Sequence, residues 1–454
     1  MIDTAQSRPI GASKTEPSQT PSNQAVNSHD IAVIGGGPAG AAVAALLAKE
    51  GFDVVLAERT RFPRFHIGES LLPHSMPILE KLGVLSKVEA IGVPKYGADF
   101  ADPDGHTRHV LFERALRPGP PSAFQVKRSD FDNVLLTNAR DQGASVLEET
   151  TVKTVDLERQ DEVRLEFEEP DGKRRWIKAR QVIDASGRDG LLARKFSMRT
   201  PNKRHQSAAV FSHYENVPRH EGNMAGNVSI YWFDHGWMWF IPLPNDQMSV
   251  GAVCETEYFK SRSVPLEQFL DDTIQRSNVA AARMKAARRI EPVRAASNYS
   301  YGADHMCGPN YVLIGDAFAF IDPVFSSGVH IALTSAILAA ELMTARLKTP
   351  KRAMAAQRKM ERRMKRGLSN ISWLIYRVKT RNMQQLFLAP RNILGVEQAV
   401  ISVLAGDFFG QFSITWRYAF FKLIFRLHRM GLVPIGDPGE TETKWDALEP
   451  SMSR

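Results

Sequence analysis

The chain has 454 residues, of which 43% are hydrophobic and 24% charged, with a formal net charge of +8 and a pI near 9.4. This composition suits a globular protein with an ample core and anionic ligands or partners, and no aromatic-basic interleaving indicates nucleic-acid binding. The two cysteines, Cys254 and Cys307, form neither a disulfide framework nor a metal site, so we expect no metal and a reducing, cytoplasmic compartment.

The N-terminal part of the chain predicts a leader followed by a nucleotide-binding unit. Residues 1–28 are rich in Ser, Thr, Gln and Pro and lack an apolar run, which indicates a disordered leader rather than a signal peptide. A short apolar strand at 30–34 then runs into a glycine-rich turn, an Ala-rich helix at 39–50 and a second strand at 52–58. This order is typical of a βαβ unit.

The glycine-rich turn has the spacing of a dinucleotide-binding loop. Gly35 allows a tight turn, Gly37 lets the backbone approach a pyrophosphate, and Gly40 lets the helix pack on the strand. The helix N-terminus faces the phosphates, and an acid at the end of the second strand accepts a hydrogen bond from the ribose. The binding residues predicted here are Gly35, Gly37, Pro38, Ala39, Gly40, Glu58 and Arg59.

The remaining elements alternate between strand-rich and helical stretches. Strands are predicted at 96–125, at 144–184 with a Pro-Asp-Gly turn at 170–172, at 205–255 and at 311–314. Helices are predicted within 62–92, with Leu79, Leu82 and Leu85 on one face, and at 128–142, 265–287, from Ser327, and beyond 350. The apolar segment 328–347 carries Glu341 and Arg346, so it predicts a buried helix rather than a membrane span.

Three later motifs join the glycine loop. They are Gly315-Asp316 after a strand, Arg128 in a Phe-Asp context, and the Asp184-Ala185-Ser186-Gly187 turn. Each is common alone, but the four in this order indicate FAD. The chain shows no second glycine fingerprint, so we expect a separate NAD(P)H flavin reductase to supply reduced FAD.

The most specific segment is Trp237-Met238-Trp239-Phe240-Ile241-Pro242, in a chain with only seven tryptophans. Residues two apart in a strand point to the same face, so Trp237 and Trp239 would form a bulky wall. Such a wall suits an enzyme that separates its organic substrate from its flavin.

These motifs resemble the flavin-dependent halogenases over roughly residues 29–345, most of all the branch that acts on pyrroles and phenolic rings, free or tethered to a carrier protein. The matching segments are Gly35–Gly40, Phe62-Pro63-Arg64, Gly68-Glu69-Ser70, Lys95-Tyr96-Gly97, Trp237–Pro242 and Gly315–Val329. The resemblance implies an α/β, glutathione-reductase-like fold built on the Rossmann-type βαβ unit. A substrate sheet is inserted at about 92–125 and 200–298, and a helical C-terminal region with a flexible tail spans 346–454.

The resemblance also implies the chemistry. Reduced FAD, oxygen and chloride or bromide give hypohalous acid, which travels through a tunnel to Lys95, and Lys95 presents the halogen to an electron-rich ring. The resemblance also places FAD against Pro323, Gly328 and Val329. It places the halide on Ser327 and Gly328, where the alternative is an ordinary serine N-cap with no ligand. Lys95 acts as an ammonium or as a neutral amine; free lysine has a pKa of about 10.4, so the second route requires burial or a nearby cation.

One position departs from the relatives that act on tryptophan. Where they carry a glutamate before the Ser-Gly pair, this chain has Phe325, which favours a self-activating phenol or pyrrole over free tryptophan. No base is identified. The histidines are scattered without catalytic or metal spacing and are expected to be structural or solvated: His66, His74, His305 and His330.

Alternative functions remain at this stage. An FAD-dependent monooxygenase or a geranylgeranyl-reductase-like oxidoreductase would use the same fold, and a non-catalytic FAD protein would be favoured by an exposed Lys95. The basic run 351–366 could meet an acidic carrier protein or form a solvated helix face. An amphipathic helix around 420–429 is expected to pack over the substrate cavity rather than on a membrane.

Overall fold

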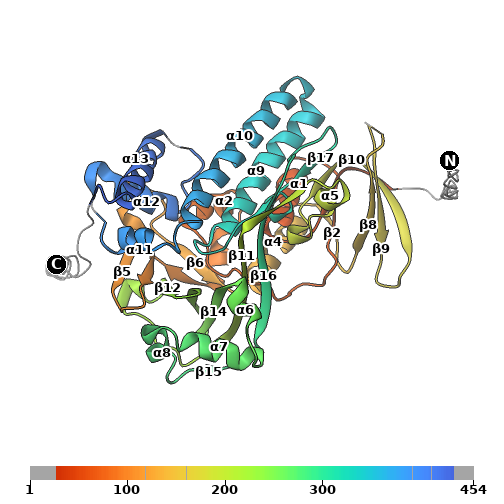
Figure 1. Cartoon of the computed structure of the whole chain (residues 1–454). Helices are drawn as coiled ribbons and strands as arrows, with labels where there is room; N and C mark the ends of the chain where they lie inside the picture. Colours follow the sequence, from red (N-terminus) through yellow and green to blue (C-terminus); the bar gives the residue numbers. More distant parts are fainter. Residues whose placement is uncertain (1–26, 118, 160, 391, 411, 434–454) are drawn as a thin grey trace, which may run out of the picture.

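The computed structural model describes residues 27–117, 119–159, 161–390, 392–410 and 412–433 (Figure 1). The predicted disordered leader lies outside these residues except for its last two, and the predicted tail beyond 433 lies outside them entirely. The first strand, β1, begins at Ser28, inside the predicted leader. The fold is of the predicted α/β class, with two large sheets and a helical C-terminal region.

The first sheet carries the nucleotide-binding unit. Its strands run in the order β7-β2-β1-β10-β9-β8, with β17 paired to β10, and β1 pairs in parallel with both β2 and β10. Both faces of this sheet are covered, so Ile31–Ile34 of β1 and all of β2 are continuous apolar runs and not alternating apolar and polar residues. The bounds are β1 Ser28–Ile34, β2 Val54–Ala57, β7 Ser145–Leu147, β8 Thr151–Asp156, β9 Val163–Glu168, β10 Arg174–Asp184 and β17 Tyr311–Leu313.

The second sheet has nine strands in the order β18-β16-β11-β14-β13-β12-β4-β5, with β15 paired to β11. One face joins the main core and the other packs on a short-helix layer, because alternate residues of β13 belong to two separate cores. The bounds are β4 Gly97–Ala101, β5 Thr107–Leu111, β11 Arg199–Glu215, β12 Val228–Phe233, β13 Gly236–Leu243, β14 Gln247–Glu255, β15 Arg288–Arg289, β16 Arg294–Ala303 and β18 Ala319–Phe320. A separate ribbon pairs β3 Gly92–Lys95 with β6 Ala123–Val126.

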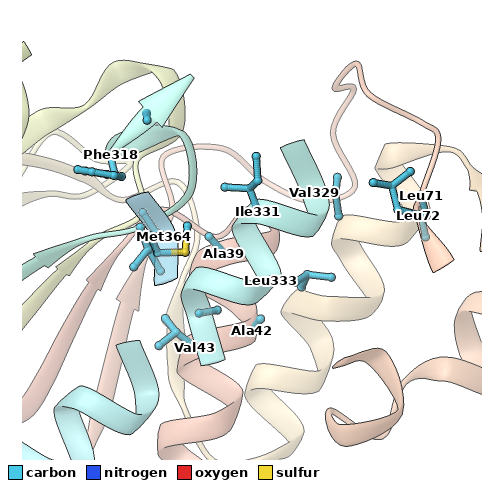
Figure 2. Packing of buried hydrophobic residues seen from close by; sticks show 14 of the residues in the cluster. Ala39, Ala42, Val43, Leu71, Leu72, Phe318, Val329, Ile331, Leu333 and Met364 are labelled. Atoms are coloured by element: carbon cyan, nitrogen blue, oxygen red, sulfur yellow. The ribbon is translucent and has the colours of Figure 1, made fainter. Parts of the chain in front are cut away.

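Helix α9, Ser327–Lys348, crosses the core as the sequence predicts. It is long and apolar enough to cross a membrane, but 67% of its apolar window is buried inside the protein, and it packs against α1 and α10. The bent pair formed by α11 and η6–α12 passes the same length and composition test. Figure 2 shows Val329, Ile331 and Leu333 of α9 within the buried cluster that also contains residues of α1, with Val329 toward Leu71 and Leu72, so this is a core helix.

The remaining helices surround these sheets, and two predicted helices are each divided. The helix expected within 62–92 breaks at Gly83, where φ is +75°, and that expected at 265–287 breaks at Ser277, whose hydroxyl caps the next helix by accepting from Ala280 N–H. The bounds are α1 Pro38–Lys49, α2 Met76–Lys81, α3 Leu85–Ile91, α4 Arg128–Asp141, α5 Leu191–Lys195, α6 Thr256–Lys260, α7 Leu266–Ile274, α8 Asn278–Arg283, α10 Pro350–Ile375, α11 Arg381–Leu388, α12 Val396–Leu404 and α13 Phe412–Arg429, with 3-10 turns η1 Pro73–Ser75, η2 Phe112–Arg114, η3 Gly187–Asp189, η4 Gly222–Met224, η5 Gly315–Ala317 and η6 Ile393–Gly395.

Candidate active site

The loop between β1 and α1 requires glycine at two of its three predicted positions. Gly35 has φ of +98°, and a Cβ there would lie 2.5 Å from the Ala185 carbonyl oxygen. A Cβ on Gly40 would lie 1.9 Å from the Gly35 carbonyl oxygen. At Gly37 the nearest atom to a Cβ would be Arg64 Nη2, at 3.6 Å. The loop therefore presents bare backbone and one arginine, which suits a phosphate group.

Glu58 holds this loop from the end of β2. Its side chain is buried, and its carboxylate accepts from Gly36 N–H at 2.7 Å and from the Thr60 hydroxyl at 2.6 Å. These bonds fix the acid beside the glycine turn. Arg59, by contrast, is mostly exposed and pairs with Asp189.

Arg128 and Asp316 come from distant parts of the chain. The Arg128 guanidinium is buried and donates two hydrogen bonds to the Asp132 carboxylate, at 2.7 and 2.9 Å. It also donates to the Ile67 carbonyl at 2.9 Å. Burial raises the pKa of Asp316 to about 6, opposed by the charges of Arg188 and Arg128. The predicted late Gly-Asp motif and the predicted arginine thus share one electrostatic environment.

Asp184 and Gly315 organise the neighbouring turns. Both Asp184 oxygens accept backbone N–H groups, from Ser186 at 2.9 Å and Leu192 at 2.7 Å, and burial raises the pKa of this carboxyl group. Its hydrogen bonds shape the turn after β10. Gly315 has φ of +56°, and its N–H donates to the Ser335 hydroxyl at 3.0 Å, which ties η5 to α9.

Among the described residues, Arg64 Nη1 and the Ser327 hydroxyl are buried in this region without a hydrogen-bond partner, although Arg64 Nη1 lies 3.4 Å from Asp132 Oδ2 as an ion pair. A buried group left unsatisfied costs about 1–3 kcal/mol, so each marks a place where a ligand can bond. Together with the bare glycine loop, the Arg64 cation fits the phosphates of FAD, and the Ser327 hydroxyl leaves a donor free for a second ligand at the start of α9. Arg64 has no assigned role in the sequence prediction, although its motif is part of the resemblance.

The turn before α9 is arranged differently from an ordinary serine cap. Ser326 is the N-cap residue, with φ of +54°, and its side chain makes no capping bond; its N–H donates to the Pro323 carbonyl at 2.9 Å. Ser327 is 1% exposed, and nothing lies within 4 Å of the place a Cβ would take on Gly328. A serine thus stands at the N-cap without a side-chain capping bond, and Gly328 leaves open space at this helix N-terminus.

Lys95 ends β3 and is 1% exposed. Its Nζ donates to the Ser70 hydroxyl at 2.8 Å and to the Leu71 carbonyl at 3.1 Å, and it lies 5.3 Å from the centre of the Phe112 ring. Burial lowers the pKa of Lys95 to about 7, opposed by the negative charge of Asp99. The exposed lysine expected of a non-catalytic FAD protein is not what the structure shows. Ser70 belongs to the Gly68-Glu69-Ser70 segment of the family resemblance, but the sequence does not indicate that its hydroxyl accepts a hydrogen bond from Lys95.

Trp237 and Trp239 lie side by side, as the strand pattern predicts. Their ring centroids are 5.9 Å apart, both are buried in the main core, and Trp239 Nε1 donates to the Ser249 hydroxyl at 3.1 Å. Trp237 is paired across the sheet with Trp232, which widens the wall.

The aromatic wall continues into the C-terminal region. Phe100 stacks on Trp232 at 5.7 Å and meets Phe387 of α11 at 5.3 Å, and Phe387 stacks on Phe325 at 6.0 Å. Phe325, which stands where relatives that act on tryptophan carry a glutamate, is thus the last ring of a continuous apolar array. The sequence could not reveal this, because Phe387 lies outside every motif.

Comparison with known proteins identifies the family. Residues 28–365 match the FAD binding domain family. The chain is 33% identical over 336 residues to the chlorinase of 1H-pyrrole-2-carbonyl-(peptidyl-carrier protein) from Pseudomonas fluorescens, a match that covers 68% of this chain and 74% of the relative. The chain belongs to the flavin-dependent halogenases.

Other halogenase relatives and solved structures agree with this assignment of fold and family. Tryptophan 2-halogenase from Chondromyces crocatus is 36% identical over 70% of this chain and 61% of its own length. The flavin-dependent halogenase CmlS superposes with a TM-score of 0.71 at 30% identity, covering 92% of this chain and 70% of CmlS. A flavoprotein/dehydrogenase from Cytophaga hutchinsonii superposes with a TM-score of 0.81 at 29% identity, covering 89% of this chain and 100% of that chain. The predicted family, fold class and use of FAD are confirmed.

Proposed function

We propose that this halogenase transfers an electrophilic halogen to a phenolic or pyrrole ring through Lys95. The observation that carries the proposal is the position of this amine, which is buried, held by Ser70 and Leu71, and shifted to a pKa of about 7. About half of such a group is neutral at pH 7, so the amine can take halogen from hypohalous acid and pass it to carbon.

The nucleotide side of the site would be formed by the glycine loop, Glu58 and Arg128, with Arg64 toward the phosphates. FAD held there supplies, once reduced, the activation of oxygen that makes the halide electrophilic. A separate NAD(P)H flavin reductase would deliver reduced FAD in the cytoplasm. We assign residues 29–345 to the catalytic core, 92–125 and 200–298 to the substrate side, and 346–454 to the helical cover.

Ser327 and Gly328 are proposed to hold the halide at the start of α9. We expect Ser327→Ala to raise the halide KM about 10-fold, because a hydrogen bond to a charged group contributes about 1.5–3 kcal/mol. FAD affinity should stay unchanged. Initial rates over a bromide series measure this effect. Ser413→Ala is the matched control, because Ser413 also has an unpaired buried hydroxyl but lies on α13. An unchanged halide KM in Ser327→Ala would remove this residue from the halide site.

The lowered pKa of Lys95 predicts the pH dependence of the halogenation step. As pH rises through about 7, the ammonium loses its proton and the nucleophilic amine appears, so the single-turnover rate should rise and then level off. Rapid-quench measurements between pH 5.5 and 9 test this expectation. A single-turnover rate that falls over the same pH range would instead indicate that the ammonium form of Lys95 is the active one.

The substrate is proposed to be a ring that activates itself, free or tethered to a carrier protein. Phe325, stacked on Phe387, offers no carboxylate to assist an unactivated ring. The pyrrole chlorinase among the relatives supports this class, while the tryptophan 2-halogenase makes free tryptophan the necessary comparison. Competition between a phenol, a carrier-tethered pyrrole and tryptophan in one reaction decides it. Preferred halogenation of tryptophan would refute the substrate assignment.

A further inference from the structure

A polar cavity lies beside the wall that holds Lys95. Its volume is about 110 Å³, against the ~150 Å³ known to hold a benzene ring, and its lining residues Arg117 and Gly119 are exposed. Phe112 connects the two sites, since it lines the cavity and its ring centre lies 5.3 Å from Lys95 Nζ. The lining residues include His74, Ser402 and Asp407.

His74, which lines the cavity, lies near the start of α9. His74 follows Leu71, the carbonyl partner of Lys95, by three residues, and its backbone N–H donates to the Ala405 carbonyl at 3.1 Å. The His74 ring lies 6.4 Å from that of His330, in the first turn of α9. Two histidines that appear scattered in the sequence therefore lie next to each other, one in a turn that follows Leu71 and one in the first turn of α9.

Burial favours a neutral imidazole at His74. Burial lowers the pKa of His74, opposed by the carboxylate of Asp407. Burial raises the pKa of Asp407, opposed by the charges of His74, Arg117 and Arg363. His330 is buried and bonded to the Ser75 hydroxyl at 3.2 Å, and burial lowers its pKa to about 3, so it carries no charge. A neutral imidazole beside a carboxylate can take up a proton that the carboxylate then stabilises.

We propose that the ring of a phenolic substrate occupies this cavity and that His74, with Asp407 beside it, accepts the phenolic proton. This inference rests on the proposed function, which places the electrophilic halogen on the Lys95 nitrogen. The O–H bond breaks and the proton passes to His74. The ring carbon then bonds to the halogen as the nitrogen–halogen bond at Lys95 breaks. The Lys95 nitrogen takes the proton from His74 and is again a neutral amine, and the ring C–H proton returns to the phenolic oxygen, which restores the aromatic ring.

The test compares two phenols of different acidity in the complete enzyme with FAD, a flavin reductase and bromide. At pH 8.5 phenol is mostly un-ionised, whereas 4-nitrophenol is mostly ionised, needs no base and keeps a ring that bromine electrophiles attack. We expect His74→Gln to slow bromination of phenol at this pH about 10²-fold relative to wild type while leaving the 4-nitrophenol rate within about twofold. Asp407→Asn should shift the same ratio in the same direction by a smaller factor. His305→Gln, at an exposed position, is the matched control.

Each outcome bears on the proposal. Equal losses for both phenols would make His74 a structural residue, and unchanged rates for both would remove it from the reaction; either result overturns the inference. Wild-type enzyme that brominates neither phenol, nor a pyrrole, would refute the proposed function instead, which separates the two failures.

Discussion

Replacing Lys95 by alanine is expected to lower the rate of halogenation by about 10³-fold or more while FAD remains bound. The amine lies in the interior, its two hydrogen bonds fix its direction, and no other lysine among the described residues is buried. Loss of a positioned nucleophile or proton donor removes a step that water cannot replace there. The measurement is product formation per FAD oxidised, in single turnovers with excess bromide.

Two controls separate chemistry from folding in that experiment. Lys95→Met fills the same space without an amine, so it should be as inactive as the alanine variant but closer to wild type in melting temperature. Lys87→Ala, at a half-exposed position on α3, should be fully active. Halogenation by Lys95→Met at the wild-type rate would exclude Lys95 from the mechanism.

Gly40→Ala is expected to weaken FAD binding by at least about 10²-fold and to lower the melting temperature. Its Cβ would lie 1.9 Å from the Gly35 carbonyl oxygen, which is backbone and cannot rotate away, so α1 must move off the glycine loop. Overpacking of this kind typically costs about 1–3 kcal/mol, and here it also displaces the phosphate-binding N–H groups. Fluorescence titration with FAD and thermal unfolding without FAD measure the two effects.

Gly302→Ala is the control for that substitution. Gly302 lies in β16, its φ is not positive, and a Cβ there would meet nothing within 4 Å. We expect it to bind FAD like wild type and to be equally or slightly more stable. Comparable FAD affinity in Gly40→Ala and Gly302→Ala would contradict the steric account of the loop.

The sequence predicts well those features that depend on local backbone geometry. The glycine loop, the facing pair Trp237 and Trp239, and the buried helix at Ser327 follow from spacing and periodicity, because each is determined within a few residues. The divided helices were missed since Gly83 and Ser277 act through one dihedral angle or one cap, against an otherwise helical pattern.

Contacts between distant segments were not predictable in the same way. Ser70 accepts a hydrogen bond from Lys95, 25 positions later in the chain, and Phe325 stacks on Phe387, 62 positions later. Such pairs depend on how the sheets and the C-terminal helices pack, which no local pattern encodes. The unusual pKa of Lys95 belongs to the same group, because burial rather than its neighbours in sequence produces it.

The most direct test of the account is the mass spectrum of the aromatic product. Purified protein would be given FAD, NADH, a flavin reductase, oxygen and bromide, with a phenol or a carrier-tethered pyrrole as substrate. The account predicts that one ring hydrogen is replaced by bromine, with its paired isotope pattern, and that Lys95→Met forms none of this product. Addition of oxygen or of two hydrogens to the substrate, without bromine, would contradict it and indicate a monooxygenase or a reductase instead.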